Sequence, residues 1–157
     1  MQTVATSLRI GSPGDLLGVV FADPLCQSMP DRTRMVQHAL ANGECMVATR
    51  NDKIVGYVIL NNSFFGHAFV PLLVVAMGSR RAGIGTELIA EAEARCKREK
   101  LFVSANESNT AAQRLFERRG FVPSGRIENL DDTDDELVYC KWMRRGALYL
   151  SNDRSEK

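Results

Sequence analysis

The stretch RRAGIGT, residues 80–86, most constrains what this chain can fold into. An apolar run at residues 69–77 precedes it and predicts a buried strand. An amphipathic segment from residue 84 to about residue 99 follows it and predicts a helix. A strand, a basic glycine-containing turn and a helix expose free backbone N–H groups at the positive end of a helix dipole. The sequence therefore predicts a phosphate site at this turn.

The residue types in the turn favour a diphosphate ligand. Gly83 and Gly85 would let the backbone approach a ligand closely, and Arg80 and Arg81 add positive charge. The spacing differs from the G-x-G-x-x-G of dinucleotide-binding folds, and the Gly-Lys-Ser/Thr of a P-loop does not follow. The alternative is a tight strand-to-helix turn whose arginines are solvated.

Composition sets the class of protein. The 157 residues carry a net charge of +1 and 45% hydrophobic side chains, which predicts a globular domain over residues 1–145 and a polar tail at 146–157. The charge argues against sequence-independent binding of nucleic acid. The longest apolar run, residues 68–77, is too short to span a membrane. The scattered cysteines predict neither a zinc site nor disulfides, so we expect a cytoplasmic protein without a metal.

The order of the other segments predicts one layered α/β domain. Further strands are predicted at residues 4–10, 44–50, 53–61, 101–105, 122–129 and 136–143, and further helices from residue 13, at 30–41 and at 110–119. Asn51 and Asp52 predict a tight hairpin, and Gly120 predicts the end of the last helix. Thr110 and Gln113 have the spacing of a capping box.

The helix predicted from residue 84 has a buried side and a solvent side. Apolar residues recur at every fourth position: Ile84, Leu88, Ala92 and Cys96. Oppositely charged pairs with i, i+4 spacing are expected on the solvent side: Glu91 with Arg95, and Glu93 with Lys97. These charges have a structural role, so only the N-terminus of the helix is a candidate site.

A second motif, NTAAQRLFERRGF, lies at residues 109–121. With the turn, it resembles the GNAT superfamily of acetyl-CoA-dependent N-acetyltransferases. Residues 80–85 are similar to that family's pyrophosphate-binding pattern, which is Gln or Arg, two residues, Gly, one residue, and Gly or Ala. Residues 109–121 are similar to its Asn…Ala-Ala…Leu-Tyr/Phe-Glu…Gly-Phe block. The resemblance covers at least residues 44–143 and implies a mixed, mostly antiparallel sheet of about six to seven strands flanked by about four helices.

The resemblance also implies acetyl-CoA as co-substrate. The strand before the turn would pair its backbone with the pantetheine arm, and the amides of the turn would hold the pyrophosphate. Asn109 would contact the cofactor arm, although its ordinary role is to cap a helix, and it could do both. Leu115, Phe116 and Phe121 are expected mainly in the core. The cofactor-binding set is Val75, Ala76, Met77, Arg80, Arg81, Ala82, Gly83, Ile84, Gly85, Thr86, Asn109 and Phe116.

The mechanism implied by the family is direct transfer, in which an acid protonates the departing thiolate. Many relatives carry tyrosine as that acid, whereas this chain has Phe116, which cannot donate a proton. Tyr139 and Ser104 are candidate substitutes, although each also fits an ordinary packed or hydrogen-bonded role. The thiolate could also leave without help, because the pKa of a thiol is about 8.5.

Candidates for the base that accepts the amine proton are equally open. His67 precedes the predicted cofactor strand, but a loop histidine is ordinarily a surface residue. Glu44 and Glu128 lie on strands or at their ends. Catalytic residues are therefore not assigned from the sequence.

Two further features concern the acceptor. Six acidic residues fall between Glu128 and Glu136, in the turn that the resemblance places near the acceptor entrance. They would attract cationic amines, or they form a solvated turn. Three aromatic residues flank the start of the predicted cofactor strand: Phe64, Phe65 and Phe69. They could form an apolar wall for the acceptor, or they could equally pack in the core.

We expect a small-molecule or peptide amine as acceptor, no nucleic acid or membrane partner, and homodimer formation as an open outcome. A first alternative is a regulatory module that binds CoA or acyl-CoA without turnover. A second is a phosphate-binding protein unrelated to acyl transfer.

Overall fold

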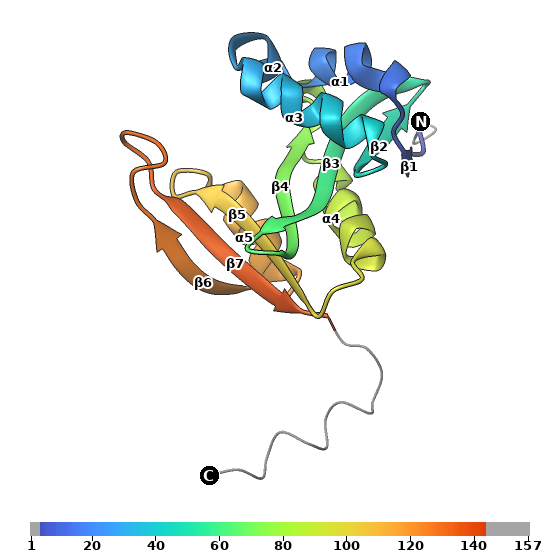
Figure 1. Ribbon diagram of the computed structural model, residues 1–157. Coiled ribbons are helices and arrows are strands. Elements are labelled where there is room, and N and C mark those ends of the chain that lie inside the picture. The colour runs from blue at the N-terminus through green and yellow to red at the C-terminus, as the bar shows by residue number, and fades with distance from the viewer. Residues whose placement is uncertain (1–3, 144–157) are drawn as a thin grey trace, which may run out of the picture.

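A seven-stranded sheet, in the order β1-β2-β3-β4-β5-β7-β6, forms the centre of the computed structural model, which describes residues 4–143 (Figure 1). Only β4 and β5 are parallel, and every other neighbouring pair is antiparallel. The strands are β1 (Ser7–Ile10), β2 (Cys45–Arg50), β3 (Lys53–Phe64), β4 (His67–Val75), β5 (Lys100–Asn106), β6 (Val122–Ile127) and β7 (Glu136–Trp142). This mixed, mostly antiparallel sheet confirms the predicted fold class. The predicted tail at 146–157 lies outside the described residues.

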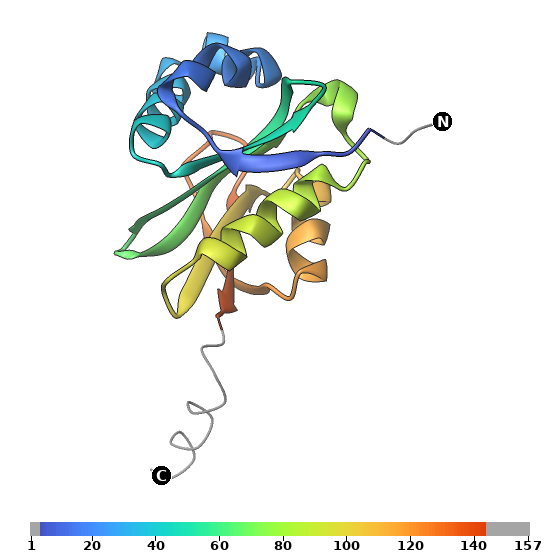
Figure 2. The same ribbon diagram turned by 90° about the vertical axis from the view of Figure 1, so that its right-hand side faces the viewer.

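Helices cover the sheet on both faces (Figure 2). They are α1 (Leu16–Ala22), α2 (Leu25–Ser28), α3 (Pro30–Ala41), α4 (Ile84–Arg95) and α5 (Thr110–Arg118), with single 3₁₀ turns η1 (Pro13–Asp15) and η2 (Met77–Ser79). The first three helices lie on one face, over β2 and β3, and α4 and α5 lie on the other. The short helix α2 was not predicted.

Two apolar cores follow from this layering. In β2, Cys45 and Val47 belong to the core under α1–α3, whereas Met46 and Ala48 belong to the core under α4 and α5. Successive side chains of a strand point to opposite faces, so a strand covered on both sides reads as an unbroken apolar run. That is why the sequence around residues 45–48 shows no alternation.

The local turn signals are confirmed. Asn51 and Asp52 both have positive φ angles, 48° and 62°, as a two-residue hairpin turn requires. Gly120 ends α5 with a φ of 87°. The predicted strand at 69–77 is shifted, because β4 begins at His67 and ends at Val75. Met77 instead lies in the 3₁₀ turn η2.

The predicted solvent pair between Glu93 and Lys97 is wrong. Helix α4 ends at Arg95, and Glu93 is buried with 8% of its surface exposed. Its carboxylate accepts a hydrogen bond from Arg119 Nε at 2.9 Å and pairs with the Lys141 ammonium. The helix pattern alone cannot reveal that α5 and β7 supply these cations. The pair between Glu91 and Arg95 is confirmed, at 2.7 Å.

A buried carboxylate fixes the other helical layer. Asp23, 2% exposed between α1 and α2, accepts hydrogen bonds from Tyr57 Oη at 2.6 Å and Arg32 Nε at 2.7 Å. Burial by itself raises the pKa of Asp23, but these two partners outweigh it, so the pKa lies below its usual value. The cluster joins the α1–α2 turn to α3 and β3.

Replacing Tyr57 with phenylalanine should therefore destabilise the protein. A hydrogen bond to a charged group contributes about 1.5–3 kcal/mol, so Tyr57→Phe should lower the free energy of unfolding by that order in urea titrations at neutral pH. Because the pKa of Asp23 is lowered, the loss should be full above the pKa of an unfolded aspartate, about 3.9, and should shrink as the pH falls through the folded-state value.

Tyr139→Phe is the matched control. The Tyr139 ring is also buried, at 4% exposure, but its hydroxyl makes no hydrogen bond within residues 4–143. Equal unfolding midpoints for the two variants would contradict the role assigned to the Asp23 cluster.

Candidate active site

The site begins where β4 and β5 part. They pair at only three positions, Ala68 with Leu101, Phe69 with Phe102, and Val70 with Val103. Both strands then continue, β4 to Val75 and β5 to Asn106, without pairing to each other. Figure 1 shows them diverging from this point. The gap leaves the backbone at residues 71–75 without a strand partner on its β5 side.

An irregularity in β4 lies at the parting point. Ile59 of β3 pairs with Leu72, whereas Asn61 pairs with Phe69, so two steps along β3 correspond to three along β4. The extra residue is a β-bulge next to Pro71, which bends the strand and ends regular pairing. We did not predict this bulge. A proline inside an otherwise continuous apolar strand was the signal that could have revealed it.

The turn before α4 presents free backbone donors. The first helical hydrogen bond runs from the Glu87 N–H to the Gly83 carbonyl, at 3.0 Å. The N–H groups of Ile84, Gly85 and Thr86 precede it and therefore have no partner within the helix. They point outward at the positive end of the helix dipole. These free donors are the groups that binding of an anion at this turn would require.

The two glycines of the turn have different structural roles. Gly83 has a φ of 79°, and a Cβ there would meet nothing within 4 Å, so this position needs glycine for its backbone angle. A Cβ at Gly85 would touch Leu115 at 3.4 Å and Val75 at 3.7 Å, which is ordinary contact. Alanine would therefore fit at position 85 but not, without strain, at position 83.

The basic residues of the turn link it to β4. The Arg80 side chain donates from Nε to the Val75 carbonyl at 3.2 Å, so it bridges the helix entrance and the end of the strand. Arg81 is exposed and takes a φ of 64°. Ala76, Met77 and Ala82 lie in the segment that connects β4 to α4. The structure thus brings together the predicted residues from 75 to 86.

Helix α5 approaches the same turn through Leu115, which lies against Gly85. Asn109 is its N-cap and accepts from the Ala112 N–H at 3.2 Å. The predicted capping box of Thr110 and Gln113 is wrong, because Gln113 Nε2 instead donates to the Glu107 carbonyl at 2.7 Å. The contact with the α4 entrance is thus made by the second half of α5 and not by its N-cap.

Phe116 is a core residue, 2% exposed. Its ring lies 5.9 Å from that of Phe121 and 5.8 Å from that of Tyr139. Burial, and next the charge of Glu117, raise the pKa of Tyr139. The Tyr139 ring therefore packs against Phe116 of α5, which is the ordinary packed role considered for it from the sequence.

The other catalytic candidates lie in different places. Ser104 directly follows the last residue of β5 that pairs with β4, so it borders the gap. His67 starts β4 three residues before the final pair, roughly 10 Å from the opening at strand spacing, with its ring 5.6 Å from Phe102. Glu44 precedes β2 and Glu128 follows β6. Ser104 is thus the candidate that the strand pairing places next to the gap.

The three aromatic residues considered for an acceptor wall gather at the closed end of the sheet. Phe64 has its ring 5.1 Å from Phe65, 5.1 Å from Phe69 and 4.9 Å from Phe102. They pack where β4 and β5 are still paired, and this placement gives no support to a wall at the gap.

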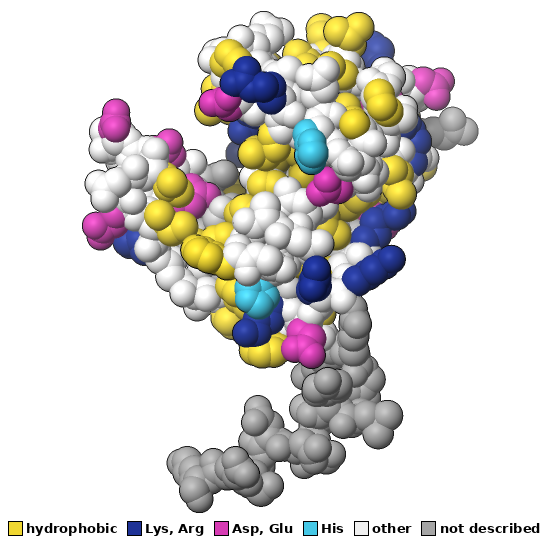
Figure 3. All heavy atoms as spheres, viewed as in Figure 1, with side chains coloured by type: hydrophobic (Ala, Val, Ile, Leu, Met, Phe, Trp, Pro, Cys, Tyr) yellow, Lys and Arg dark blue, Asp and Glu magenta, His cyan; other side chains and the backbone are white. Residues whose placement is uncertain are grey.

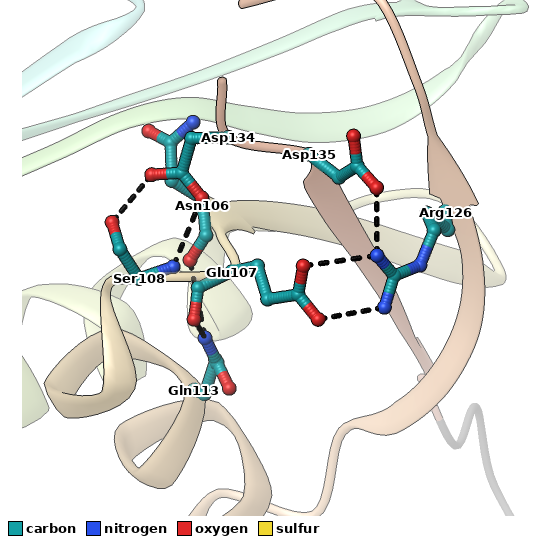
Figure 4. A network of polar contacts seen from close by, with 7 residues as sticks. All are labelled: Asn106, Glu107, Ser108, Gln113, Arg126, Asp134 and Asp135. Atoms are coloured by element: carbon teal, nitrogen blue, oxygen red, sulfur yellow. Dashed lines mark hydrogen bonds and ion pairs between the residues drawn. The ribbon is translucent and has the colours of Figure 1, made fainter.

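The acidic turn between β6 and β7 is tied to the β5–α5 loop (Figure 4). Arg126 bridges Glu107 at 2.8 Å and Asp135 at 2.7 Å, and these partners, Glu107 first, raise its pKa. The Ser108 N–H donates to Asp134 at 3.1 Å. Asn106 Nδ2 donates to Asp131 at 2.7 Å. The turn is therefore held in one position beside the gap.

Two other acidic side chains of this hairpin make no ion pair within residues 4–143. Asp132 and Glu128 are exposed, and neither makes an ion pair within the part of the chain that the structure describes. Figure 3 shows acidic side chains on the lobe formed by this hairpin, across a hollow from the lobe of α1–α3. The gap thus has a positive helix end and an acidic hairpin at its borders.

Comparison with known proteins identifies the fold and the family. The sequence profile of the acetyltransferase (GNAT) family matches residues 18–121. The chain belongs to this family. No curated protein matches the sequence.

Three solved structures show the range of similar proteins. A GNAT-family acetyltransferase from Bacillus cereus ATCC 10987 is 28% identical, with a TM-score of 0.82 over 90% of this chain and 99% of its own. The ribosomal-protein-S18-alanine N-acetyltransferase of Escherichia coli is 18% identical, with a TM-score of 0.77 over 93% and 99%. The diaminobutyrate acetyltransferase EctA of Paenibacillus lautus is 19% identical, with a TM-score of 0.71 over 92% and 99%. That structure contains 2,4-diaminobutyric acid and coenzyme A.

Two negative findings apply to residues 4–143. No helix there combines the length and apolar character needed to cross a bilayer. Nor do three or more His, Cys, Asp and Glu side chains of this part gather where they would hold a metal ion.

Removing one free amide at the α4 entrance should weaken CoA binding. Thr86 is exposed in the first helical turn, where proline is tolerated because its N–H has no helical partner. A lost hydrogen bond to a charged group is worth about 1.5–3 kcal/mol, so Thr86→Pro should raise the Kd for CoA by about tenfold or more in calorimetry.

Thr86→Ala keeps the amide and is the control for that experiment. It should bind CoA within about twofold of the parent protein, since only the side chain changes. Equal affinities for the alanine and proline variants, both folded, would rule out the amide cradle.

Proposed function

We propose that this GNAT protein transfers the acetyl group of acetyl-CoA directly to a primary amine. The observation that carries the proposal is the set of free amides at Ile84, Gly85 and Thr86, next to the end of β4 and the gap beside it. A diphosphate at the helix entrance and a thioester in the gap would be joined by an arm running along β4. The coenzyme A bound to the related EctA supports this cofactor.

The cofactor contacts follow from that path. Amides of residues 83–86 hold the pyrophosphate, and Arg80 and Arg81 contribute charge. The backbone edge of β4 from residue 71 to Val75 pairs with the pantetheine arm at the groups that the Arg80 hydrogen bond to the Val75 carbonyl leaves free, and Ala76 and Met77 continue the contact. Asn109 combines its capping role with a contact to the arm, while Phe116 supports it from the core.

The chemistry requires little of the side chains at the leaving group. The amine nitrogen attacks the thioester carbonyl, a C–N bond forms and the C–S bond breaks. Free backbone N–H groups at the gap stabilise the negative oxygen that develops. Phe116 has no proton to give, and the Tyr139 ring packs against Phe116 in the core. In this proposal the thiolate departs unassisted and takes a proton from water. A thiol pKa of about 8.5 makes this departure feasible near neutral pH.

Two of the named relatives have acceptors of different size, the amino acid 2,4-diaminobutyric acid and an alanine of ribosomal protein S18. We therefore propose a small-molecule or peptide amine as the acceptor class. A cytoplasmic location and a homodimer remain predictions from the sequence and the family.

The test is to incubate the protein with acetyl-CoA and a panel of primary amines, and to follow free thiol and acetylated product. Thiol release that depends on the amine, with product detected by mass spectrometry, is the expected result. Tight CoA binding without thiol release on any amine would favour a regulatory module. Equal thermal protection by ADP and by CoA would favour a phosphate-binding protein unrelated to acyl transfer.

Charge on the hairpin should affect cationic acceptors only. Asp132 and Glu128 are exposed and free of ion pairs within residues 4–143, so neutralising both leaves the Arg126 network intact. The variant Glu128→Gln/Asp132→Asn should raise the KM for a diamine by roughly threefold to tenfold at low salt, and less at high salt.

The KM for acetyl-CoA should be unchanged in the same variant. Asp52→Asn, in the distant β2–β3 turn, is the control for loss of one exposed carboxylate. If the diamine KM did not move at low salt, the hairpin would have only its structural role.

A further inference from the structure

Glu136 and Ser104 lie on the same face of the sheet. Val103 and Ala105 of β5 point into the core under α4 and α5, so Ser104 between them points to the opposite face. Ser104 pairs with Val138 of β7. Glu136, two residues from Val138, is therefore the diagonal neighbour of Ser104 on that face.

Helices α1 and α3 pack on β3 and β2, at the other side of the gap (Figure 1). On the β7 part of this face Val138 is buried at 5% exposure, whereas Ser104 and Glu136 beside it are partly exposed. The hollow in Figure 3 lies between those helices and the acidic hairpin. Glu136 is partly buried at the start of β7, where the hairpin joins the sheet. Glu136 therefore lies at the end of β7 that adjoins the hairpin.

The gap between β4 and β5 is one strand away from Glu136, because β5 lies between β7 and the gap. Val103 is the last β5 residue paired with β4, and Ser104 is the next. Neighbouring strands are about 4.8 Å apart, and diagonal residues are within reach of long side chains. A glutamate at position 136 can therefore extend over Ser104 towards the opening between β4 and β5.

The surroundings of Glu136 favour uptake of a proton. Burial raises the pKa of its carboxyl, the Ser104 hydroxyl partly offsets that rise, and Asp131 and Asp134 raise it further. Asn106, directly opposite on β5, is neutral and is engaged with Asp131. Glu136 makes no ion pair with any cation of the described chain. Glu136 is thus an acidic side chain of the hairpin end that lies diagonally from Ser104 at the gap.

We propose that Glu136 is the general base of the transfer reaction and that Ser104 is its positioning residue, an assignment that rests on the proposed function. The acceptor enters from the hairpin side as an ammonium ion. One proton passes from its nitrogen to the Glu136 carboxylate and then to water. The neutral amine attacks the thioester, and the second proton leaves the nitrogen as the C–S bond breaks. The released thiolate takes up one proton, so the net products are amide, thiol and one free proton.

Glu136→Gln tests the base directly. General base catalysis contributes about 100- to 10,000-fold, so kcat/KM for the amine should fall by that order at neutral pH while the Kd for CoA stays unchanged. The remaining rate should rise continuously with pH, because solvent then supplies the deprotonated amine, whose pKa is about 10.4 for a lysine-like acceptor. Wild-type activity should instead level off above the pKa of Glu136.

Ser104 variants test the positioning role through the pH profile. Removing the hydroxyl takes away the group that favours the charged carboxylate, so Ser104→Ala should move the acidic limb of kcat/KM to higher pH. The plateau at high pH should be largely retained. Ser104→Thr keeps a hydroxyl and should restore the original limb. This result stands independently if Glu136→Gln does not fold.

Glu99→Gln, an exposed glutamate in the loop before β5, is the matched control and should behave as wild type. A Glu136→Gln protein with wild-type kcat/KM and pH profile would overturn the assignment of Glu136 while leaving amine acetylation in place. A wild-type protein that binds CoA but acetylates no amine would overturn the proposed function and this assignment together.

Discussion

The short pairing between β4 and β5 is the constraint on which the rest of the structure depends. Buried backbone N–H and C=O groups ordinarily find partners, and a strand that stops pairing inside a sheet leaves several of them free. The bulge beside Pro71 lies where this pairing ends. Helices α1 and α3 pack on β3 and β2, and α5 packs on β5, so each side of the gap has its own helical cover. The same opening leads to the free amides at the α4 entrance.

The two sides of that opening carry charges of opposite sign. The α4 entrance combines free amides, the positive end of a helix and two arginines, and it suits an anionic ligand. The hairpin between β6 and β7 carries carboxylates, and the contacts of Arg126, Asn106 and Ser108 fix its position. An anionic cofactor and a cationic acceptor would therefore approach from different directions and meet where the strands part.

Phe116 explains why the proton transfers are proposed at other groups. Its ring fills the core against Phe121 and Tyr139, so the packing role of this position is retained without a hydroxyl group. A thiolate can leave without an acid far more readily than an ammonium ion can attack without a base. The demand for a titratable group therefore falls on the acceptor side, where Glu136 lies, and not on the cofactor side.

The sequence by itself determined the features that depend on neighbouring residues. The turn at 80–86, the hairpin at Asn51 and Asp52 and the stop at Gly120 follow from local backbone preferences, which a few residues specify. Tertiary structure alone decided which side chains and strands from distant parts of the chain contact one another. It buried Glu93 against Arg119 and Lys141, separated β4 from β5, and brought Glu136 beside Ser104. These contacts join segments that are distant along the chain, and no local pattern records which strand or helix will supply the partner.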